Sequence, residues 1–292
     1  MVDFYPFRAV RYDLNVAGAM PELMCPPYDV ISPNLESVLL ARNPYNMVRL
    51  ELSEPEGSPS SERYASAARF LSSWMSNGVL DRDFEPNYYL LRQKFIWDGS
   101  VYERHGFFGV IRLHELGGDV LPHEHTAPGP KSDRLELMKA CQANFSPVMG
   151  LFRDSSQIVK QIRGRVQARE PYCDFNDNDG HQYTLWNISN LEETRALRLA
   201  LESEKVYIAD GHHRYETAIA YRDMVRLGSG GTEEAASEFV MACLIAFDDP
   251  GLLVLPYHRV IHGLTEGKLA AVRDRLMQVF NNEKSSISGF PI

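Results

Sequence analysis

A long hairpin in the first half of the chain limits the fold more than any other segment. Two aromatic-rich runs, NYYLLRQKFIW and SVYERHGFFGVIRL, stand on either side of Asp98-Gly99. Asp-Gly readily takes the left-handed backbone of a tight turn, so the runs predict two long antiparallel strands. A second hairpin is predicted in YCDFNDNDGHQYTLWNI, with its turn at Asp179-Gly180. The fold must therefore contain a sheet with antiparallel pairs.

Helices are expected before, between and after these strands. The segments whose apolar residues recur three and four positions apart are 61–78, 132–145, 156–169, 190–203 and 210–228. Further strands are predicted in SPVMGLF, KVYIA, FVMACLIAF and GLLVLPYHRVI. Prolines break the first sixty residues into short extended pieces, without a long helix. Because helices and strands mix without strict alternation, we predict an α+β fold, a mixed and largely antiparallel sheet with helices on its faces.

The length and composition fit one large globular domain. With 292 residues, 44% of them hydrophobic, the chain can bury a sizeable core, so we expect a single α+β domain over 1–292. Two lobes, 1–150 and 151–292, are the alternative division. The four cysteines lack C-x-x-C spacing, which favours free thiols in a reducing cytosol over a disulfide framework or a zinc site.

The charge balance limits the class of partner. The chain has 30 basic and 39 acidic residues and a formal charge of -9, which disfavours binding to a nucleic acid backbone. No uncharged run approaches the roughly 18 residues of a membrane span, and the start MVDFYPFRAVRYD is unlike a signal segment. We therefore expect a cytoplasmic protein with small-molecule partners, without nucleic acid or membrane. Whether it forms a homo-oligomer is left open.

A strand, a glycine and a helix start meet in VYIADGHHRYETAIAY. Gly211 permits a sharp turn, and the N–H groups and positive dipole end of the following helix favour an anion, so this strand-turn-helix element predicts phosphate binding. Arg214 adds a planar fork suited to phosphate oxygens. His212 and His213 can donate hydrogen bonds or move protons near neutral pH. Asp210 is a candidate helix cap, ligand of a divalent ion, or acceptor of a hydroxyl proton.

The structural alternative for this cluster is that Asp210 only caps the helix and that the two histidines are ordinary surface or hydrogen-bonded residues. One isolated histidine or aspartate would favour that alternative. Five polar or turn-forming residues of complementary type at one strand-to-helix junction favour a functional site.

A second cluster lies in LPHEHTAPGPKSDRLELMKACQANFSPV. His-x-His on an extended segment puts His123 and His125 on one face with Glu124 opposite, but it lacks the H-E-x-x-H spacing of a zinc protease helix. The basic helix start that follows is better suited to a second anionic group. The structural alternative is a solvated loop and a helix capped by Ser132 or Asp133. The further binding candidates are His123, Thr126, Lys131, Asp133, Arg134, Asn144, Ser146 and, from LPYHR, Arg259.

The motifs IADGHHRYETA, NPYNMVRLEL, HEHT with PKSDRLELMKA and ANFSPV, and LPYHR resemble the bacterial and archaeal family named domain of unknown function 1015. They span 43–259, most of the chain. The resemblance implies no activity, because the family is named for lacking one. Members of that family generally continue beyond SISGFPI, so we expect either that a C-terminal segment of the family is absent here or that this is a short member.

A shorter resemblance does imply chemistry. The stretch around DGHHR is similar to the signature of sulfiredoxin, the ParB nucleotide-binding domain and the free serine kinases, in which this turn and helix start hold nucleotide phosphates. The likeness implies that Gly211, His213 and Arg214 hold phosphate and that Asp210 matches the acid of the kinases. The reactive cysteine of sulfiredoxin falls at His212, so sulfinic acid reduction is not implied.

The leading hypothesis is an enzyme that transfers a phosphoryl group between ATP or ADP and a small hydroxyl compound, such as a hydroxy amino acid like serine, or that removes phosphate from phosphoserine. Such chemistry needs cations around the phosphates, usually including Mg²⁺, and an acid that orients the nucleophile. Asp210, His212, His213 and Glu124 are the catalytic candidates, with Asp210 and Glu124 also the Mg²⁺ ligands. A ParB-like nucleotide-gated binding module and a metal-dependent hydrolase are the alternatives.

Overall fold

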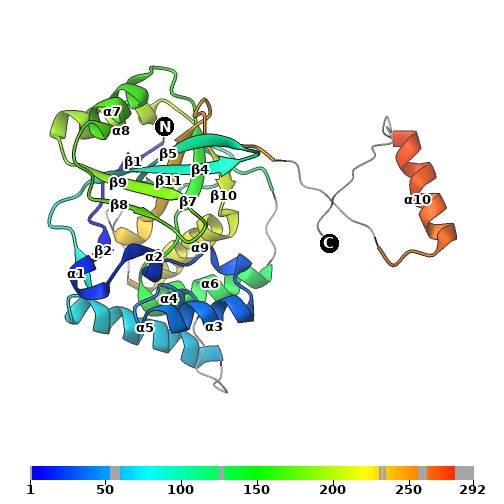
Figure 1. The fold of residues 1–292 in the computed structure, drawn as a ribbon, viewed down its shortest axis with the longest axis horizontal. Helices are drawn as coiled ribbons and strands as arrows, with labels where there is room; N and C mark the ends of the chain where they lie inside the picture. The colour runs from blue at the N-terminus through cyan, green and yellow to red at the C-terminus, as the bar shows by residue number, and fades with distance from the viewer. Residues whose placement is uncertain are drawn as a thin grey trace. The chain divides into compact units, whose positions relative to one another are not determined.

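The computed structural model describes residues 2–52, 60–124, 128–229, 232, 235–255 and 262–279. The chain forms two compact units, Met1–Leu252 and Leu253–Ile292 (Figure 1). All strands of the described residues, and every residue of the sites discussed below, belong to the first unit. In the described part of the second unit, the one helix is α10 (Glu266–Val279).

Nine strands of the described residues pair in one sheet, in the order β6-β10-β7-β11-β5-β4-β9-β8, with β1 beside β5. Their bounds are β1 Phe4–Tyr5, β4 Tyr88–Trp97, β5 Ser100–Arg112, β6 Val120–Leu121, β7 Val148–Phe152, β8 Cys173–Asn176, β9 Gln182–Ile188, β10 Val206–Asp210 and β11 Phe239–Ala246. Only β10 with β6 and β11 with β7 pair in parallel. The mixed, largely antiparallel sheet confirms the predicted fold class, and strands from both halves of the chain contribute to it. A separate pair joins β2 (Val10–Tyr12) and β3 (Leu80–Arg82).

The two predicted hairpins are present. Strands β4 and β5 meet at Asp98 and Gly99, whose φ angles of 46° and 71° lie in the left-handed region. Strands β8 and β9 meet in a turn where Gly180 has a φ of 81°. Both turns need positive φ, which explains why Asp-Gly occupies each of them.

Helices lie on either side of the sheet in the view of Figure 1, with α7 and α8 above it and α3 to α6 and α9 below. The helix bounds are α1 Leu14–Ala17, α2 Met20–Leu23, α3 Pro33–Arg42, α4 Val48–Glu51, α5 Ser60–Ser76, α6 Pro128–Cys141, α7 Ile158–Gln167, α8 Leu191–Glu202 and α9 His212–Ser229. Short 3-10 turns occupy η1 (Tyr28–Val30) and η2 (Ala236–Glu238).

Two apolar clusters hold these layers together. The larger joins the sheet to α7, α8 and α9 through residues such as Phe152, Ile162 and Leu197, each fully buried. The smaller lies among the N-terminal helices around Leu23 and Trp74. The second cluster fixes the N-terminal helices, whose buried ends carry part of the site described below.

Several expected boundaries were wrong. Proline was taken as a breaker throughout the first sixty residues, yet Pro33 opens the ten-residue helix α3, where Ser32 caps the helix and the missing N–H of proline costs nothing. Helix α6 begins at Pro128 rather than at residue 132, so neither Ser132 nor Asp133 is its cap. Residues 251–255 do not form the predicted strand, and residues 256–261 lie outside the described part of the chain. Helix α10 was not predicted.

All four cysteines are free thiols, and Cys243 is buried. Across the described residues, none of the helices combines the length and the apolar character that crossing a bilayer requires.

Candidate functional site

The junction between β10 and α9 is built around a glycine that no other residue replaces easily. Gly211 has a φ of 88°, in the left-handed region, and a Cβ added there would lie 2.9 Å from Nε of Arg214. The guanidinium of Arg214 therefore folds back over the glycine backbone. This close approach explains why a glycine precedes the first turn of α9.

Arg214 is held by two acceptors from neighbouring segments. Its Nη2 donates to Oδ2 of Asp210 at 2.6 Å, and its Nη1 donates to the carbonyl oxygen of Pro147, just before β7. The Arg214 side chain is 17% exposed, whereas that of Asp210 is 63% exposed. The carbonyl oxygen of Pro147 thus holds the guanidinium from the interior, while the carboxylate of Asp210 is exposed to solvent. Asp210 is the more replaceable of the two partners.

Arg214 faces a small pocket that also contains residues of the second sequence cluster. The polar and aromatic residues lining this pocket are Tyr28, Glu51, Arg134, Asn144, Phe145, Ser146 and Arg214. Its volume is about 40 Å³, which is room for a few water molecules and is far below the size of a pocket that encloses a metabolite. We call it the arginine pocket. Four of the predicted binding residues therefore line one pocket, which is too small in this structure to hold a metabolite.

Glu51 is the anchor of the arginine pocket. Its Oε2 accepts from Nη1 of Arg134 at 2.7 Å, and its Oε1 accepts from the hydroxyl of Ser146 at 2.7 Å. Both Glu51 and Arg134 are buried. The guanidinium of Arg134 also stacks on the ring of Tyr28, with its central carbon 4.0 Å from the ring centroid. The tyrosine therefore covers the arginine from the side of η1.

Two predicted binding residues of α6 are engaged elsewhere. Asp133 accepts from the hydroxyl of Tyr64 at 2.8 Å and pairs with Arg63 at 3.1 Å, and it also binds Arg134. Lys131 forms an ion pair with Glu216 of α9. Neither residue lines the arginine pocket. Asp133 and Lys131 bind α6 to α5 and α9, and a role of either residue in ligand binding stays a prediction.

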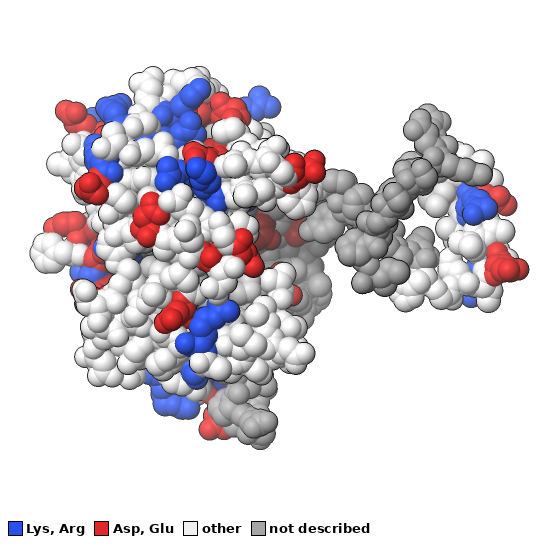
Figure 2. Space-filling model, in the orientation of Figure 1, with Lys and Arg blue, Asp and Glu red and all other residues white. Residues whose placement is uncertain are grey.

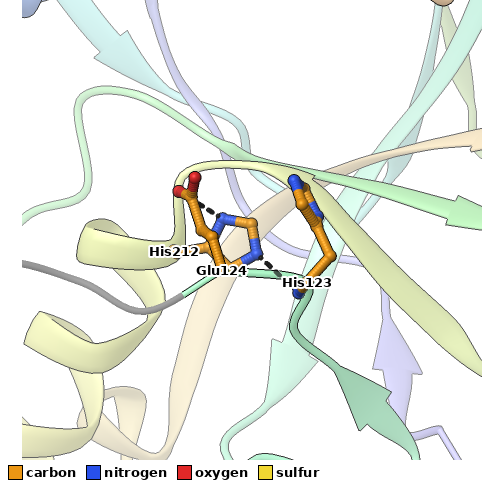
Figure 3. A group of neighbouring side chains, drawn as sticks. All are labelled: His123, Glu124 and His212. Atoms are coloured by element: carbon orange, nitrogen blue, oxygen red, sulfur yellow. Dashed lines mark hydrogen bonds and ion pairs between the residues drawn. The ribbon is translucent and has the colours of Figure 1, made fainter. Parts of the chain in front are cut away.

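A second group of side chains lies beside the same first turn of α9, where His212 meets His123 and Glu124 of the segment after β6 (Figure 3). Nε2 of His212 accepts the backbone N–H of His123 at 3.2 Å, and the two imidazole rings meet edge to face. His123 itself donates through Nδ1 to the carbonyl oxygen of Ile208 at 2.7 Å. His212 is 1% exposed and Glu124 is 54% exposed. We call His123, Glu124 and His212 the histidine cluster.

The hydrogen bonds determine which ring nitrogens carry protons. A backbone N–H can only donate, so Nε2 of His212 is unprotonated and Nδ1 carries the proton of the neutral ring. Oε1 of Glu124 lies 3.0 Å from this Nδ1, at ion-pair distance but out of line for a hydrogen bond. His212 therefore keeps a buried N–H donor without an aligned acceptor. By the same reasoning, the lone pair of His123 is on Nε2.

Burial also determines the charge of His212. Desolvation lowers the pKa of His212 below its ordinary value, although the neighbouring Glu124 carboxylate acts in the opposite direction. The ring is accordingly neutral near pH 7, which agrees with the tautomer given by its hydrogen bond. His213, which follows it, is half-buried.

The histidine cluster has ligand types that suit a metal ion. One donor atom from each of His123, Glu124 and His212 lies within 4.8 Å of the others, and His123 is oriented by a carbonyl as metal-binding histidines often are. The lone pair of neutral His212, however, is occupied by the His123 N–H. The three residues fit a metal ion only if that backbone hydrogen bond breaks.

The thiols near the arginine pocket are not nucleophiles. Burial, reinforced by the carboxylate of Glu51, raises the pKa of Cys25 to about 12 and that of Cys141 to about 11. Both remain protonated at neutral pH, and a thiol reacts mainly as its thiolate.

The structure brings most of the sequence-predicted residues together around the start of α9, with Thr126 and Arg259 lying outside the described residues. Sequence reasoning missed Glu51 and Tyr28. Glu51 had a signal, because it is the one acid in the stretch MVRLEL, where every other residue except Arg49 is apolar. Tyr28 had none, because an aromatic residue beside Pro-Pro is equally typical of a surface turn.

The face of the molecule seen in Figure 2 carries charges of both signs. Figure 2 shows acidic and basic side chains mixed over the visible face of the described chain, without one extended basic area. No curated protein and no solved structure matches this sequence. One family model does, over residues 4–290, and it is described as protein of unknown function. This match covers nearly the whole chain, so the protein belongs to the DUF1015 family.

Proposed function

We propose that this protein is an enzyme that transfers a phosphoryl group between a nucleotide and a small hydroxyl compound. One observation carries the proposal. The first turn of α9 presents Arg214 to the arginine pocket and His212 to the carboxylate of Glu124. The first turn of α9 therefore carries an arginine for a phosphoryl group and a histidine beside Glu124, which offers a carboxylate for a hydroxyl proton from the segment after β6. These are the groups that the reaction requires.

The arginine pocket is the phosphate side of the proposed site. Arg134 and Arg214 offer planar forks, and Asn144 and Ser146 add neutral polar groups. The phosphoryl oxygens take over the place of Asp210 on Arg214, because the Asp210 side chain is 63% exposed and is easily displaced into solvent. The pocket must open for this, and Tyr28, which covers Arg134, is the group that moves.

The histidine cluster is the hydroxyl side. Glu124 accepts the proton of the substrate hydroxyl while the N–H at Nδ1 of His212 donates to the same oxygen, which supplies the acceptor that this buried donor lacks. The oxygen then bonds to phosphorus, the bond from phosphorus to the nucleotide oxygen breaks, and the nucleotide leaves with that electron pair. His212 positions the substrate hydroxyl, and Glu124 accepts the proton of that hydroxyl. The reverse direction uses the same groups.

Asp210 and Glu124 would hold a Mg²⁺ ion that accompanies the nucleotide, since both carboxylates are exposed, Asp210 at the end of β10 and Glu124 beside His212. The likeness of DGHHR to free serine kinases makes ATP or ADP with serine, or phosphoserine, the first substrates to test. Inside a cell, such substrates correspond to a cytoplasmic metabolic enzyme.

Two other functions remain as alternatives. A nucleotide-gated binding module would use the arginine pocket without turnover. A metal-dependent hydrolase would use the histidine cluster, whose ligand types favour it, but the hydrogen bond to Nε2 of His212 opposes it. Metal content of the purified protein separates the hydrolase from the other two, because only the hydrolase holds one Zn²⁺ or Mn²⁺ per chain through nitrogen ligands.

The test of the proposal is ligand-dependent thermal unfolding. Wild type, Arg214→Ala and Arg195→Ala are melted with ATP, ADP, CTP, serine and phosphoserine, each with and without Mg²⁺. A ligand that binds only the folded state raises the melting temperature according to its saturation. Arg195 is the matched control, because it is an exposed arginine of α8 that does not line the arginine pocket.

We expect a nucleotide or phosphoserine to raise the melting temperature of wild type and of Arg195→Ala, and to have no effect on Arg214→Ala. An equal rise in all three proteins would place the ligand elsewhere. No rise with any ligand would remove the phosphate proposal.

A further inference from the structure

A second cavity lies in the first unit, and it shares no residue with the arginine pocket or the histidine cluster. It is formed by β5, the first turns of α7 and the segment that follows β11, and its volume is about 340 Å³. That is within the range of pockets that enclose small metabolites. Among its lining residues are His105, Lys160, Arg163, Asp248 and Asp249.

The inner wall of this cavity is a buried carboxylate that is fully engaged. The side chain of Asp249 is 1% exposed. Its Oδ1 accepts the backbone N–H of Gly251 at 3.0 Å, and its Oδ2 lies 3.0 Å from Nδ1 of His105 and 3.2 Å from Nη1 of Arg163. A buried charge with this many donors is stable and is not available to a ligand.

His105 is also engaged at both ring nitrogens. Its Nε2 lies 3.0 Å from the amide nitrogen of Gln167, which can only donate, so Nε2 accepts and Nδ1 donates to Asp249. The histidine and the aspartate therefore hold the segment after β11 against α7. They shape the cavity and fix Arg163, but they do not offer groups to a ligand.

Two cations on α7 do offer free donors. Lys160 and Arg163 are one turn apart on the same helix, and both line the cavity. Arg163 donates through Nη1 to Asp249, and the described residues supply no hydrogen-bond partner for its Nε and Nη2. No described side chain contacts the ammonium group of exposed Lys160. Together they present two positively charged donors to one end of a ligand.

The segment after β11 supplies the opposite charge. Asp248 is exposed and lines the cavity, and its carboxylate has no partner among the described residues. The remaining acid of the wall, Asp154, is occupied, because it accepts the N–H groups of Val159 and Lys160 at the start of α7. The groups left for a ligand are two cations and one carboxylate, with the apolar surface of Phe107 and Pro250 nearby.

We propose that this cavity binds a small zwitterion, a free α-amino acid being the simplest. The ligand carboxylate lies on Lys160 and Arg163, and its ammonium group lies on Asp248. A doubly charged anion such as phosphate is repelled by Asp248, and a simple cation is repelled by Lys160 and Arg163. Neither kind of ligand therefore pairs with all three groups. This site is independent of the phosphoryl transfer proposed above.

The test is calorimetric titration of the full chain with glycine, alanine and glutamate, and with three partial probes. Propionate has the carboxylate alone, ethylamine has the ammonium alone, and inorganic phosphate has only negative charge. The variants are Lys160→Gln and Asp248→Asn, at exposed positions whose replacement leaves the Asp249 network intact. Arg165→Gln is the matched control, because it removes a positive charge from the same helix outside the cavity.

We expect at least one amino acid to bind and the three partial probes to bind at least tenfold more weakly. Lys160→Gln and Asp248→Asn each weaken the amino acid by about fivefold or more, the effect of one partly screened ion pair, and Arg165→Gln leaves it unchanged. Binding that is equal in all variants would overturn the proposal. So would a preference for phosphate or propionate over every amino acid, or no binding of any amino acid.

Discussion

The first turns of two long helices of the first unit, α8 and α9, carry side chains of opposite charge. Helix α8 starts with Asn190, whose side chain accepts the N–H groups of Glu192 and Glu193 at 3.0 Å and 3.1 Å. Glu192 and Glu193 are both acids, and the positive end of a helix dipole favours negative charge. Helix α9 starts after Gly211, and its first turn holds two histidines and an arginine with no acid.

The difference indicates what each helix start is for. The start of α8 is satisfied by its own side chains, as a helix that only supports the fold should be. The start of α9 puts a guanidinium near the positive end of a helix dipole, which costs stability locally, and places a buried imidazole beside an exposed carboxylate. Departures from local preference concentrate at functional sites. Substitutions at α8 should therefore change stability alone, whereas substitutions at α9 should change function with little effect on stability.

The largest expected effect is on catalysis. Glu124→Gln keeps the shape of the side chain but removes the proton acceptor, so we expect kcat to fall by about 10²- to 10⁴-fold with KM nearly unchanged. The measurement is steady-state kinetics with the substrate found by thermal unfolding. Exposed Glu192→Gln at the start of α8 is the control and should keep full activity. Loss of activity in both variants would remove the contrast between the two helices.

A large effect on stability is expected where the site is also structural. Arg134→Ala leaves the buried Glu51 carboxylate without its cation, and such a change costs about 3–5 kcal/mol of unfolding free energy. Arg214→Ala breaks an ion pair with the exposed Asp210 and should cost no more than about 1 kcal/mol. Urea denaturation measures both. Equal losses would mean that Arg214 is as structural as Arg134.

Replacing the cap of α8, Asn190, should lower stability without changing ligand binding, unlike substitutions at the start of α9. Asn190→Ala removes the acceptor of two N–H groups and should lower the unfolding free energy by about 1 kcal/mol. Ligand binding at the start of α9 should not change. If this variant instead weakened the ligand and kept its melting temperature, the assignment of α8 as a purely supporting helix would be wrong.

The smallest expected effect is a dependence of stability on pH. The folded-state pKa of His212 is lowered by burial, so below about pH 6.5 the unfolded chain binds a proton that the folded chain resists. The stability due to the neutral ring is complete above that pH and is lost as the pH falls through the folded-state pKa. Melting temperatures between pH 7.5 and 5.0 should decline more steeply for wild type than for His212→Gln. Parallel curves would contradict the buried neutral imidazole.

The sequence predicted the longer strands of the sheet and the helices α5 to α9 because their signals are local. Asp98-Gly99 and Asp179-Gly180 required positive φ at two turns, and apolar spacing located α5, α7, α8 and α9. Pro33 was misread because proline has two meanings, a break inside a helix and a good first residue, and only the cap at Ser32 distinguishes them. Local pattern found α6 but misplaced its start, which lies in a Pro-Gly-Pro segment.

The site was predicted only in part, because its contacts join distant segments. DGHHR and HEHT were recognised from residue type, and the sheet brings them together through the pairing of β6 with β10. The roles of Lys131 and Asp133 depended on partners in α9 and α5, which charge alone does not reveal. Glu51 and Tyr28 reach the arginine pocket from the N-terminal helices, and no spacing rule connects them to Arg214.

The most direct test of phosphoryl transfer is a ³¹P NMR time course of the protein with ATP or ADP, Mg²⁺ and serine, repeated with Glu124→Gln. The proposal predicts a new phosphate monoester resonance that grows as the terminal nucleotide phosphate declines, and that is at least a hundredfold slower in the variant. A nucleotide that binds but remains unchanged would contradict enzymatic transfer and would favour a binding module. Monoester formation at the same rate in both proteins would contradict the role of Glu124.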